Sequence, residues 1–381
     1  MIADPALSQI AETLVVATGV APGASLALAE RRSGAWRIRL GSAGFLDHAT
    51  KRAVCPETPY DLASVTKPVL ALTLARLDAA GALSLADPLG RHLPEVRGTE
   101  SAELPLELFL AHRAGLEAHR PLFAPLLSGA PFSRAAALRE ASRARRPEAA
   151  GAAPSAGFPP VYSDLGYLLL GAAVERAVGR PLDALIQAEV AAPLGLWLGS
   201  ARQALAQVPD FCARVAPTEI VPWRGGLISG VVHDENAWAL SGHACSGHAG
   251  LFGTAEAVAR FGAAMLDLLA GRAPSLLPAT TADLLVRERP GSSLRAGFDG
   301  VSGPGSAAGT KLGPRTFGHL GFTGTSLWCD PDAEIVTALL TNRVHPTREH
   351  VEIRRARPRV QDALFGLTGI GASTGLPEAP G

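Results

Sequence analysis

Residues 60–68 read Tyr-Asp-Leu-Ala-Ser-Val-Thr-Lys-Pro, and an apolar helical run follows to about Ala80, where Gly81 ends it. Ser64 and Lys67 form an S-x-x-K pair at the start of this predicted helix. Residues three apart share a helix face, so the amine of Lys67 can reach the hydroxyl of Ser64. A neutral amine can accept the serine proton and make the hydroxyl a competent nucleophile. The free N–H groups at a helix N-terminus also stabilise a developing oxyanion.

The rarity of lysine strengthens this interpretation. The chain has 35 Lys and Arg residues, but only Lys51, Lys67 and Lys311 are lysines. A position that keeps lysine where arginine is the usual choice suggests a need for an amine that can lose its proton. The alternative is a serine on a first helical turn beside a solvated lysine. The apolar helix that follows Lys67 argues against it, because that helix should be buried.

Length and composition describe a packed globular enzyme. The 381 residues suffice for two domain-sized cores, or for one large domain with a big insertion. Hydrophobic residues make up 47% and charged residues 18%, which excludes a disordered chain. The formal net charge is zero, so nothing draws the protein to nucleic acid or to an anionic membrane surface.

The sequence also predicts a cytoplasmic location. No run of about 18 apolar residues is free of charge, glycine or proline, so no membrane span is expected. The N-terminus lacks the basic and apolar regions of a secretory signal. Cys55, Cys212, Cys245 and Cys329 are widely scattered without a CxxC pair, which suggests mostly buried free thiols in a reducing compartment.

Strand-like segments occur at both ends of the chain. Near the N-terminus a helix is predicted over 3–18, followed by a hairpin of 24–29 and 36–40. Near the C-terminus strands are predicted around 316–322, 325–329 and 334–341, and then a helix over 349–366 interrupted at Pro358. From 82 to 280 helical segments dominate, including a strongly apolar helix at 165–178.

These elements predict an α+β fold, in which one antiparallel β-sheet is flanked by helices and carries an inserted all-helical lobe. The sheet domain would be discontinuous, formed by residues 1–80 and 281–381, and the mostly helical lobe would span 81–280. Clefts between such lobes are favoured ligand sites. We expect the loops 117–160 and 198–230 to set substrate specificity. The sequence leaves the oligomeric state open.

Three further segments follow the S-x-x-K pair in order. They are Leu-Phe-Leu-Ala-His-Arg-Ala-Gly-Leu (108–116), Val-Tyr-Ser-Asp-Leu-Gly-Tyr-Leu-Leu-Leu-Gly (161–171) and Phe-Gly-His-Leu-Gly-Phe-Thr-Gly-Thr-Ser (317–326). The ordered set resembles the motifs of the serine β-lactamase and penicillin-binding-protein-like hydrolases: class C β-lactamases, D-alanyl-D-alanine carboxypeptidases and related esterases. The resemblance extends over about residues 55–345, and it implies the fold predicted above and acyl transfer by Ser64.

The resemblance implies that Tyr162 shares proton handling with Lys67 and protonates the leaving group. A phenol can act as a base when nearby cations lower its pKa. The alternative is a tyrosine whose hydroxyl caps a buried contact, an ordinary role for a single tyrosine.

Asp164 departs from the asparagine that is usual in the family. An amide can bridge the lysine and a substrate carbonyl, whereas a carboxylate can only accept. The carboxylate of Asp164 should hold Lys67 protonated and thereby move the base role toward Tyr162. This would disfavour good turnover of β-lactams or peptide amides. Asp164 could instead cap the helix that begins at Leu165. Both interpretations stay open here.

His319, Gly321 and Phe322 match the third motif. There His319 would present a partly positive group to a substrate carboxylate or to the oxyanion, and Gly321 would let the strand backbone approach the ligand. The resemblance makes the backbone N–H groups of Phe322 and Ser64 the oxyanion hole. Lys311-Leu-Gly313 is a rival K-x-G, but it lies in a Gly/Ser/Pro-rich stretch and ranks below His319.

The segment 231–237, with His243, Cys245 and His248 close behind, contains residue types that bind metals. No established zinc spacing appears, so we predict neither a metal nor another cofactor. His233 and His248 are instead candidates to support the site residues. His112 is expected to satisfy backbone groups of its turn.

We therefore predict a serine hydrolase that forms an acyl-enzyme on Ser64. Its substrate would be a small ester, peptide or β-lactam, with esterase or D-amino-acid peptidase activity preferred and weak β-lactamase activity possible. A second hypothesis is a catalytically inactive family member that acts as a binding or assembly protein, because fold alone does not determine function. The joint presence of Ser64, Lys67 and Tyr162 argues against it.

Overall fold

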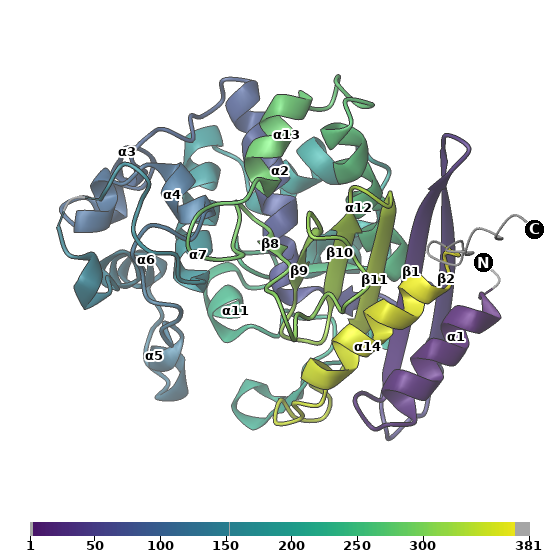
Figure 1. The fold of residues 1–381 in the computed structure, drawn as a ribbon. Coiled ribbons are helices and arrows are strands. Elements are labelled where there is room, and N and C mark those ends of the chain that lie inside the picture. The colour runs from purple at the N-terminus through teal and green to yellow at the C-terminus, as the bar shows by residue number, and fades with distance from the viewer. Residues whose placement is uncertain (1–2, 152, 370–381) are drawn as a thin grey trace, which may run out of the picture.

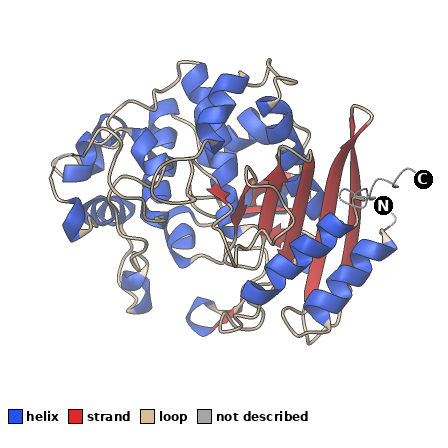
Figure 2. Ribbon diagram, in the orientation of Figure 1, coloured by secondary structure: helices blue, strands red, loops and turns tan. Residues whose placement is uncertain are grey.

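Strands from the two ends of the chain build one six-stranded antiparallel sheet (Figures 1 and 2). The computed structural model describes residues 3–151 and 153–369. The sheet runs in the order β2-β1-β11-β10-β9-β8. Its strands are β1 (Gly23–Arg32), β2 (Ala35–Gly44), β8 (Asp299–Gly300), β9 (Phe317–Leu320), β10 (Ser326–Asp330) and β11 (Ile335–Thr341). The pairing of β1 with β11 joins the N-terminal hairpin to the C-terminal strands, which confirms the predicted α+β fold.

Helices cover both faces of the sheet. On one face lie α1 (Pro5–Ala11) and α14 (Ile353–Gly366), where Leu26 and Leu28 of β1 join their apolar cluster. On the opposite face lies α12 (Ala255–Leu269), against β1, β10 and β11. There β1 presents Ala27 and Ala29. The alternation along β1 therefore assigns large side chains to one layer and small ones to the other.

Most of the other helices lie on the side of the sheet where β8 forms its edge (Figure 1). Two of them, α2 (Thr66–Ala79) and α7 (Asp164–Val178), are almost wholly buried. The remaining helices are α3 (Leu89–His92), α4 (Leu106–Leu110), α5 (Ala124–Leu127), α6 (Arg134–Arg143), α8 (Leu182–Ile186), α9 (Ala201–Gln207), α10 (Phe211–Arg214), α11 (Glu235–Ser241) and α13 (Ala279–Val286). The structure also has two small sheets. One consists of β3 (Tyr60–Asp61), β7 (Leu251–Gly253) and β4 (Leu198–Ser200), and the other of β5 (Ile220–Val221) and β6 (Gly226–Leu227). The division of the chain at residues 80 and 280 stays a prediction.

The helix α14 differs from its prediction, because it runs through Pro358 without a break. Proline removes one helical hydrogen bond there. On either side of it, Ile353, Ala356, Val360 and Leu364 pack in the apolar cluster beneath the sheet, and this burial outweighs the lost bond.

The cysteine prediction holds only in part. All four thiols are free, and Cys245 and Cys329 are buried, but Cys55 and Cys212 are exposed. Within residues 3–151 and 153–369, no helix has the length and apolar character needed to cross a membrane.

Close backbone contact positions α7, whose first residue is Asp164. A Cβ added at Gly171 would lie 2.7 Å from the backbone nitrogen of Gly247, whereas one added at Gly166 would meet nothing nearer than 3.6 Å. We expect Gly171→Ala to lower the free energy of unfolding by about 1–3 kcal/mol, because the backbone cannot move aside cheaply. The matched change Gly166→Ala should raise it by up to about 1 kcal/mol, since alanine favours the helix. Urea denaturation of both variants measures this, and equal stability would contradict the contact.

Candidate active site

The nucleophile segment connects β3 to α2. A short 3-10 turn at Ala63–Val65 precedes α2, so Ser64 lies just before the helix and Lys67 in its first turn. The Nζ of Lys67 donates to the Oγ of Ser64 at 2.8 Å. The i, i+3 geometry expected from the S-x-x-K pair is therefore present.

The amine of Lys67 is fully buried and makes several polar contacts. It donates to the hydroxyl of Tyr162 at 2.7 Å and to Oδ1 of Asp164 at 2.6 Å. A longer contact of 3.4 Å reaches the carbonyl of His248. Burial lowers the pKa of Lys67, and the Asp164 carboxylate opposes this effect without cancelling it. The site thus holds an amine that gives up its proton more readily than an exposed lysine does.

Tyr162 is held by His112. The two rings lie 4.8 Å apart, and Nδ1 of His112 accepts the backbone N–H of Ser163 at 3.0 Å. His112 therefore satisfies a backbone group, as expected, but on the Tyr162 segment rather than on its own turn. Burial, assisted by the negative charge of Asp164, raises the pKa of Tyr162 well above its usual value. This opposes the expectation that Asp164 moves the base role to Tyr162, because the phenol keeps its proton.

Asp164 does not cap its helix. The cap of α7 is Ser163, whose hydroxyl accepts the N–H of Gly166 at 3.2 Å. The Asp164 carboxylate instead pairs with Lys67. Of the two interpretations left open by the sequence, the structure favours the contact with lysine.

His319 lies on β9 with its ring 5.9 Å from that of Tyr162. Its Nδ1–H donates to the carbonyl of Leu320 at 2.7 Å. Burial, together with the charge of Lys67, lowers the pKa of His319 to about 3. This low pKa disfavours a charged imidazole in the free protein, and the contact of His319 with a substrate carboxylate or oxyanion stays a prediction.

Gly321 and Phe322 follow β9 and lie beside the nucleophile segment. A Cβ at Gly321 would come within 2.6 Å of the carbonyl oxygen of Leu62, so the glycine permits this close approach. The side chain of Phe322 is half exposed and lines both pockets that contain Ser64. Its carbonyl accepts from Nε of Arg343 at 2.8 Å. An oxyanion hole formed by Phe322 and Ser64 stays a prediction.

The other residues considered from the sequence lie elsewhere or have other partners. Lys311 is exposed, and its backbone N–H donates to Asp362 on α14, away from the serine. His233 pairs with Glu219 at 2.9 Å, and His248 pairs with Asp234 at 2.8 Å. Among residues 3–151 and 153–369, no three His, Cys, Asp or Glu side chains gather as a metal ion would require.

Two pockets meet at Ser64, and Asp164, Phe322 and Arg348 line both of them. One, of about 480 Å³, is lined by His319 and by four arginines: Arg343, Arg348, Arg354 and Arg357. The other, of about 370 Å³, is lined by the acidic residues Asp164, Asp234 and Glu235 and by His119 and Phe123. The sequence allowed for a few arginines near His319 in a local positive pocket, but it did not identify these four individually. Their only signal is the arginine-rich stretch 343–359, which composition alone does not connect to the serine.

Most of these arginines are not neutralised by acidic side chains. Arg343 donates to the carbonyls of Phe322, Arg348 and His350, and Arg357 donates to those of Gly321 and Thr325. Among the described residues, Arg343, Arg354 and Arg357 form no salt bridge. Burial lowers the pKa of Arg357 to about 9, which leaves it charged near neutral pH. The larger pocket therefore carries an excess of positive charge.

Fold and site together define the class: a serine hydrolase in which the amine of a lysine, rather than a histidine, bonds the serine and also a tyrosine. The chain belongs to the Beta-lactamase family, whose profile matches residues 11–361. It is 32% identical over 329 residues to Esterase EstB of Burkholderia gladioli, covering 79% of this chain and 82% of that protein. It is 29% identical over 324 residues to the N-acetylmuramyl-L-alanine amidase of Bacillus subtilis (strain 168), covering 76% and 68%.

A solved structure with the same fold is that of EstCE1, a hydrolase with promiscuous acyltransferase activity. It has a TM-score of 0.70 and 22% sequence identity, and the match covers 95% of this chain and 99% of that one. At this identity the likeness shows the fold alone.

The charge of Asp164 should tune the amine of Lys67. We expect Asp164→Asn to lower the pKa of Lys67, because the negative charge that favours the protonated amine is removed. If Lys67 must be neutral for Ser64 to react, the acidic limb of the rate of fluorophosphonate labelling then moves to lower pH. Asp299→Asn is the control, since Asp299 lines the same pocket without contacting Lys67. If the acidic limb stays at the same pH or moves to higher pH, neutral Lys67 is not the base for Ser64.

Proposed function

We propose that the protein hydrolyses a carboxylic ester or a small amide through an acyl-enzyme on Ser64. The observation that carries the proposal is the buried amine of Lys67, which contacts both the Oγ of Ser64 and the hydroxyl of Tyr162. The names of two relatives of this chain support the proposal: Esterase EstB, and Putative D-alanyl-D-alanine carboxypeptidase from Escherichia coli (strain K12).

In the acylation step, Oγ of Ser64 attacks the substrate carbonyl carbon while its proton passes to neutral Lys67 at 2.8 Å. The carbonyl oxygen becomes an oxyanion, which accepts hydrogen bonds from the N–H groups of Ser64 and Phe322. The bond to the leaving group then breaks. The departing oxygen or nitrogen takes the phenolic proton of Tyr162, and Lys67 returns a proton to the phenolate across 2.7 Å.

Deacylation reverses these roles. A water molecule attacks the acyl-enzyme carbonyl and gives a proton to the same amine and phenol pair. Collapse of the second tetrahedral intermediate releases the carboxylic acid and returns the proton to the Oγ of Ser64. Lys67 suits the base role and Tyr162 the acid role, because burial lowers the pKa of the amine and raises that of the phenol.

The substrate proposed is one with a carboxylate. Arg343, Arg354 and Arg357 line the larger pocket beside Ser64 without an acidic partner, so an anion can replace the missing counter-charge. An ester is preferred over an amide. Asp164 can accept but not donate, so it cannot bridge Lys67 and an amide carbonyl as an asparagine would.

The experiment that tests this function is intact-protein mass spectrometry after incubation with a fluorophosphonate and, separately, with a penicillin. We expect a fluorophosphonate adduct on wild type and none on Ser64→Ala. A stable penicilloyl adduct as well would favour the peptidase type over the esterase. No adduct from either reagent, in well-folded wild-type protein, would contradict Ser64 as the nucleophile and favour the inactive binding protein.

Arg354 offers a clean test of carboxylate binding, because its side chain is exposed in the pocket. We expect Arg354→Gln to raise KM about fivefold for phenyl esters that carry a carboxylate on the acyl chain or on the leaving group. KM for a neutral phenyl ester should change little. The matched control is Arg355→Gln, whose side chain is exposed but does not line the pocket. If Arg354→Gln raises KM equally for neutral and anionic esters, Arg354 does not bind a substrate carboxylate.

A further inference from the structure

Asp61 is a buried carboxylate three residues before Ser64. Its Oδ1 accepts the backbone N–H of Ala63 at 2.8 Å, and its Oδ2 accepts the backbone N–H of His233 at 2.7 Å. It is 2% exposed and forms no salt bridge among the described residues. A buried carboxylate without a cation is unfavourable unless hydrogen bonds stabilise it. Both oxygens of Asp61 are used in this way.

The first partner of Asp61 is in a strained conformation. Ala63 has φ of +48°, in the left-handed region that residues with a Cβ seldom adopt. Such backbone persists only where neighbouring groups hold it. The bond from the Ala63 N–H to Asp61 closes the turn that contains Ser64, which lines both pockets.

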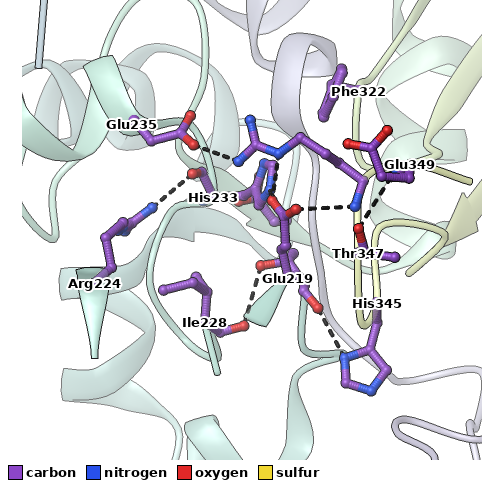
Figure 3. A network of polar contacts seen from close by, with 12 residues as sticks. Glu219, Arg224, Ile228, His233, Glu235, Phe322, His345, Thr347 and Glu349 are labelled. Carbon is purple, nitrogen blue, oxygen red and sulfur yellow. Dashed lines mark hydrogen bonds and ion pairs between the residues drawn. The ribbon is translucent and has the colours of Figure 1, made fainter. Parts of the chain in front are cut away.

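The second partner of Asp61 is His233, whose ring packs against Phe322. The His233 ring stacks on that of Phe322, with centroids 5.8 Å apart and an interplanar angle of 17°. The same ring is fixed by Glu219 at 2.9 Å (Figure 3). Glu219 also pairs with Arg348 at 2.6 Å. The backbone of His233, from which this ring projects, is the part that Asp61 holds.

The turn after β9 is fastened to the same segment. The hydroxyl of Thr323 donates to the carbonyl of Asp61 at 2.8 Å, and that of Thr325 donates to the carbonyl of Leu62 at 2.9 Å. Phe322 lies within this turn. The segment around Asp61 therefore bonds the residues next to both Ser64 and Phe322, which are Ala63 and Thr323.

We propose that Asp61 is a positioning residue, whose carboxylate holds Ala63 in its left-handed turn and fixes the distance between the N–H groups of Ser64 and Phe322. The inference rests on the proposed function, because it takes these two N–H groups as the oxyanion hole. Oxyanion stabilisation depends steeply on donor position, and losing one donor lowers kcat by about 10²–10³-fold.

The test is the isosteric variant Asp61→Asn, in the full chain with a chromogenic ester. The amide oxygen can accept only one of the two N–H groups, and the amide NH₂ then faces the other donor. We expect kcat to fall about 10- to 100-fold, while KM stays within about threefold, because the pocket side chains are unchanged.

The matched control is Asp330→Asn. Asp330 is also 2% exposed and accepts the backbone N–H groups of Gly313, Asp332 and Ala333, at the far end of β10. We expect it to lower the melting temperature as Asp61→Asn does, but to leave kcat within about twofold. If Asp61→Asn does not fold, Asp61→Ser, which keeps a single hydroxyl acceptor, takes its place.

Rescue distinguishes positioning from a general structural role. Glycine adopts positive φ without steric cost, so Ala63→Gly in the Asp61→Asn background should restore kcat by about tenfold. Ala63→Gly should not restore kcat in the His233→Ala background. There Asp61 still holds Ala63, but the ring that stacks on Phe322 is missing.

Two outcomes would overturn the inference while the proposed function stands. One is a wild-type kcat in Asp61→Asn, and the other is a loss of kcat that Ala63→Gly does not restore. Failure of the proposed function looks different, because wild-type protein would then hydrolyse no ester and form no fluorophosphonate adduct at Ser64.

Discussion

The burial of one amine is the constraint on which the rest of the site depends. Lys67 lies on a helix that is buried on nearly every side, where an amine without hydrogen-bond partners would be strongly destabilising. Its partners Tyr162 and Asp164 lie almost a hundred residues further along the chain. The amine is therefore satisfied only when the segment before α7 is docked against α2. The contacts that complete the fold here are the same contacts that surround Ser64 with proton acceptors and donors.

Backbone strain and a close approach occur beside this amine. Ala63 and His112 both have positive φ, and Gly321 lies where any side chain would collide with the carbonyl of Leu62. Both left-handed residues are held by buried hydrogen bonds: the N–H of Ala63 donates to Asp61, and the ring of His112 accepts the N–H of Ser163. The protein thus uses stability from its large apolar core to keep a small number of polar groups at fixed separations.

Charge is balanced over the whole chain but not within the cleft. The formal net charge is zero, yet Arg343, Arg354 and Arg357 line one side of Ser64 and Asp234 and Glu235 line the other. A substrate that bridges the two sides would face mainly arginines in one pocket and the carboxylates of Asp234 and Glu235 in the other. Such local fields can orient a small molecule even where net charge exerts no attraction at long range.

By itself the sequence determined the features that depend on neighbouring residues. Alternation identified the strands at both chain ends, apolar periodicity and Gly81 bounded α2, and the S-x-x-K spacing brought Lys67 to Ser64. Four further features appear only in the tertiary structure. They are the lowered pKa of His319, the contact of Asp164 with lysine, the arginine-lined pocket and the two bonds of Asp61. The physical reason is that protonation and electrostatics depend on burial and on distances between segments far apart in the chain, which local patterns do not encode.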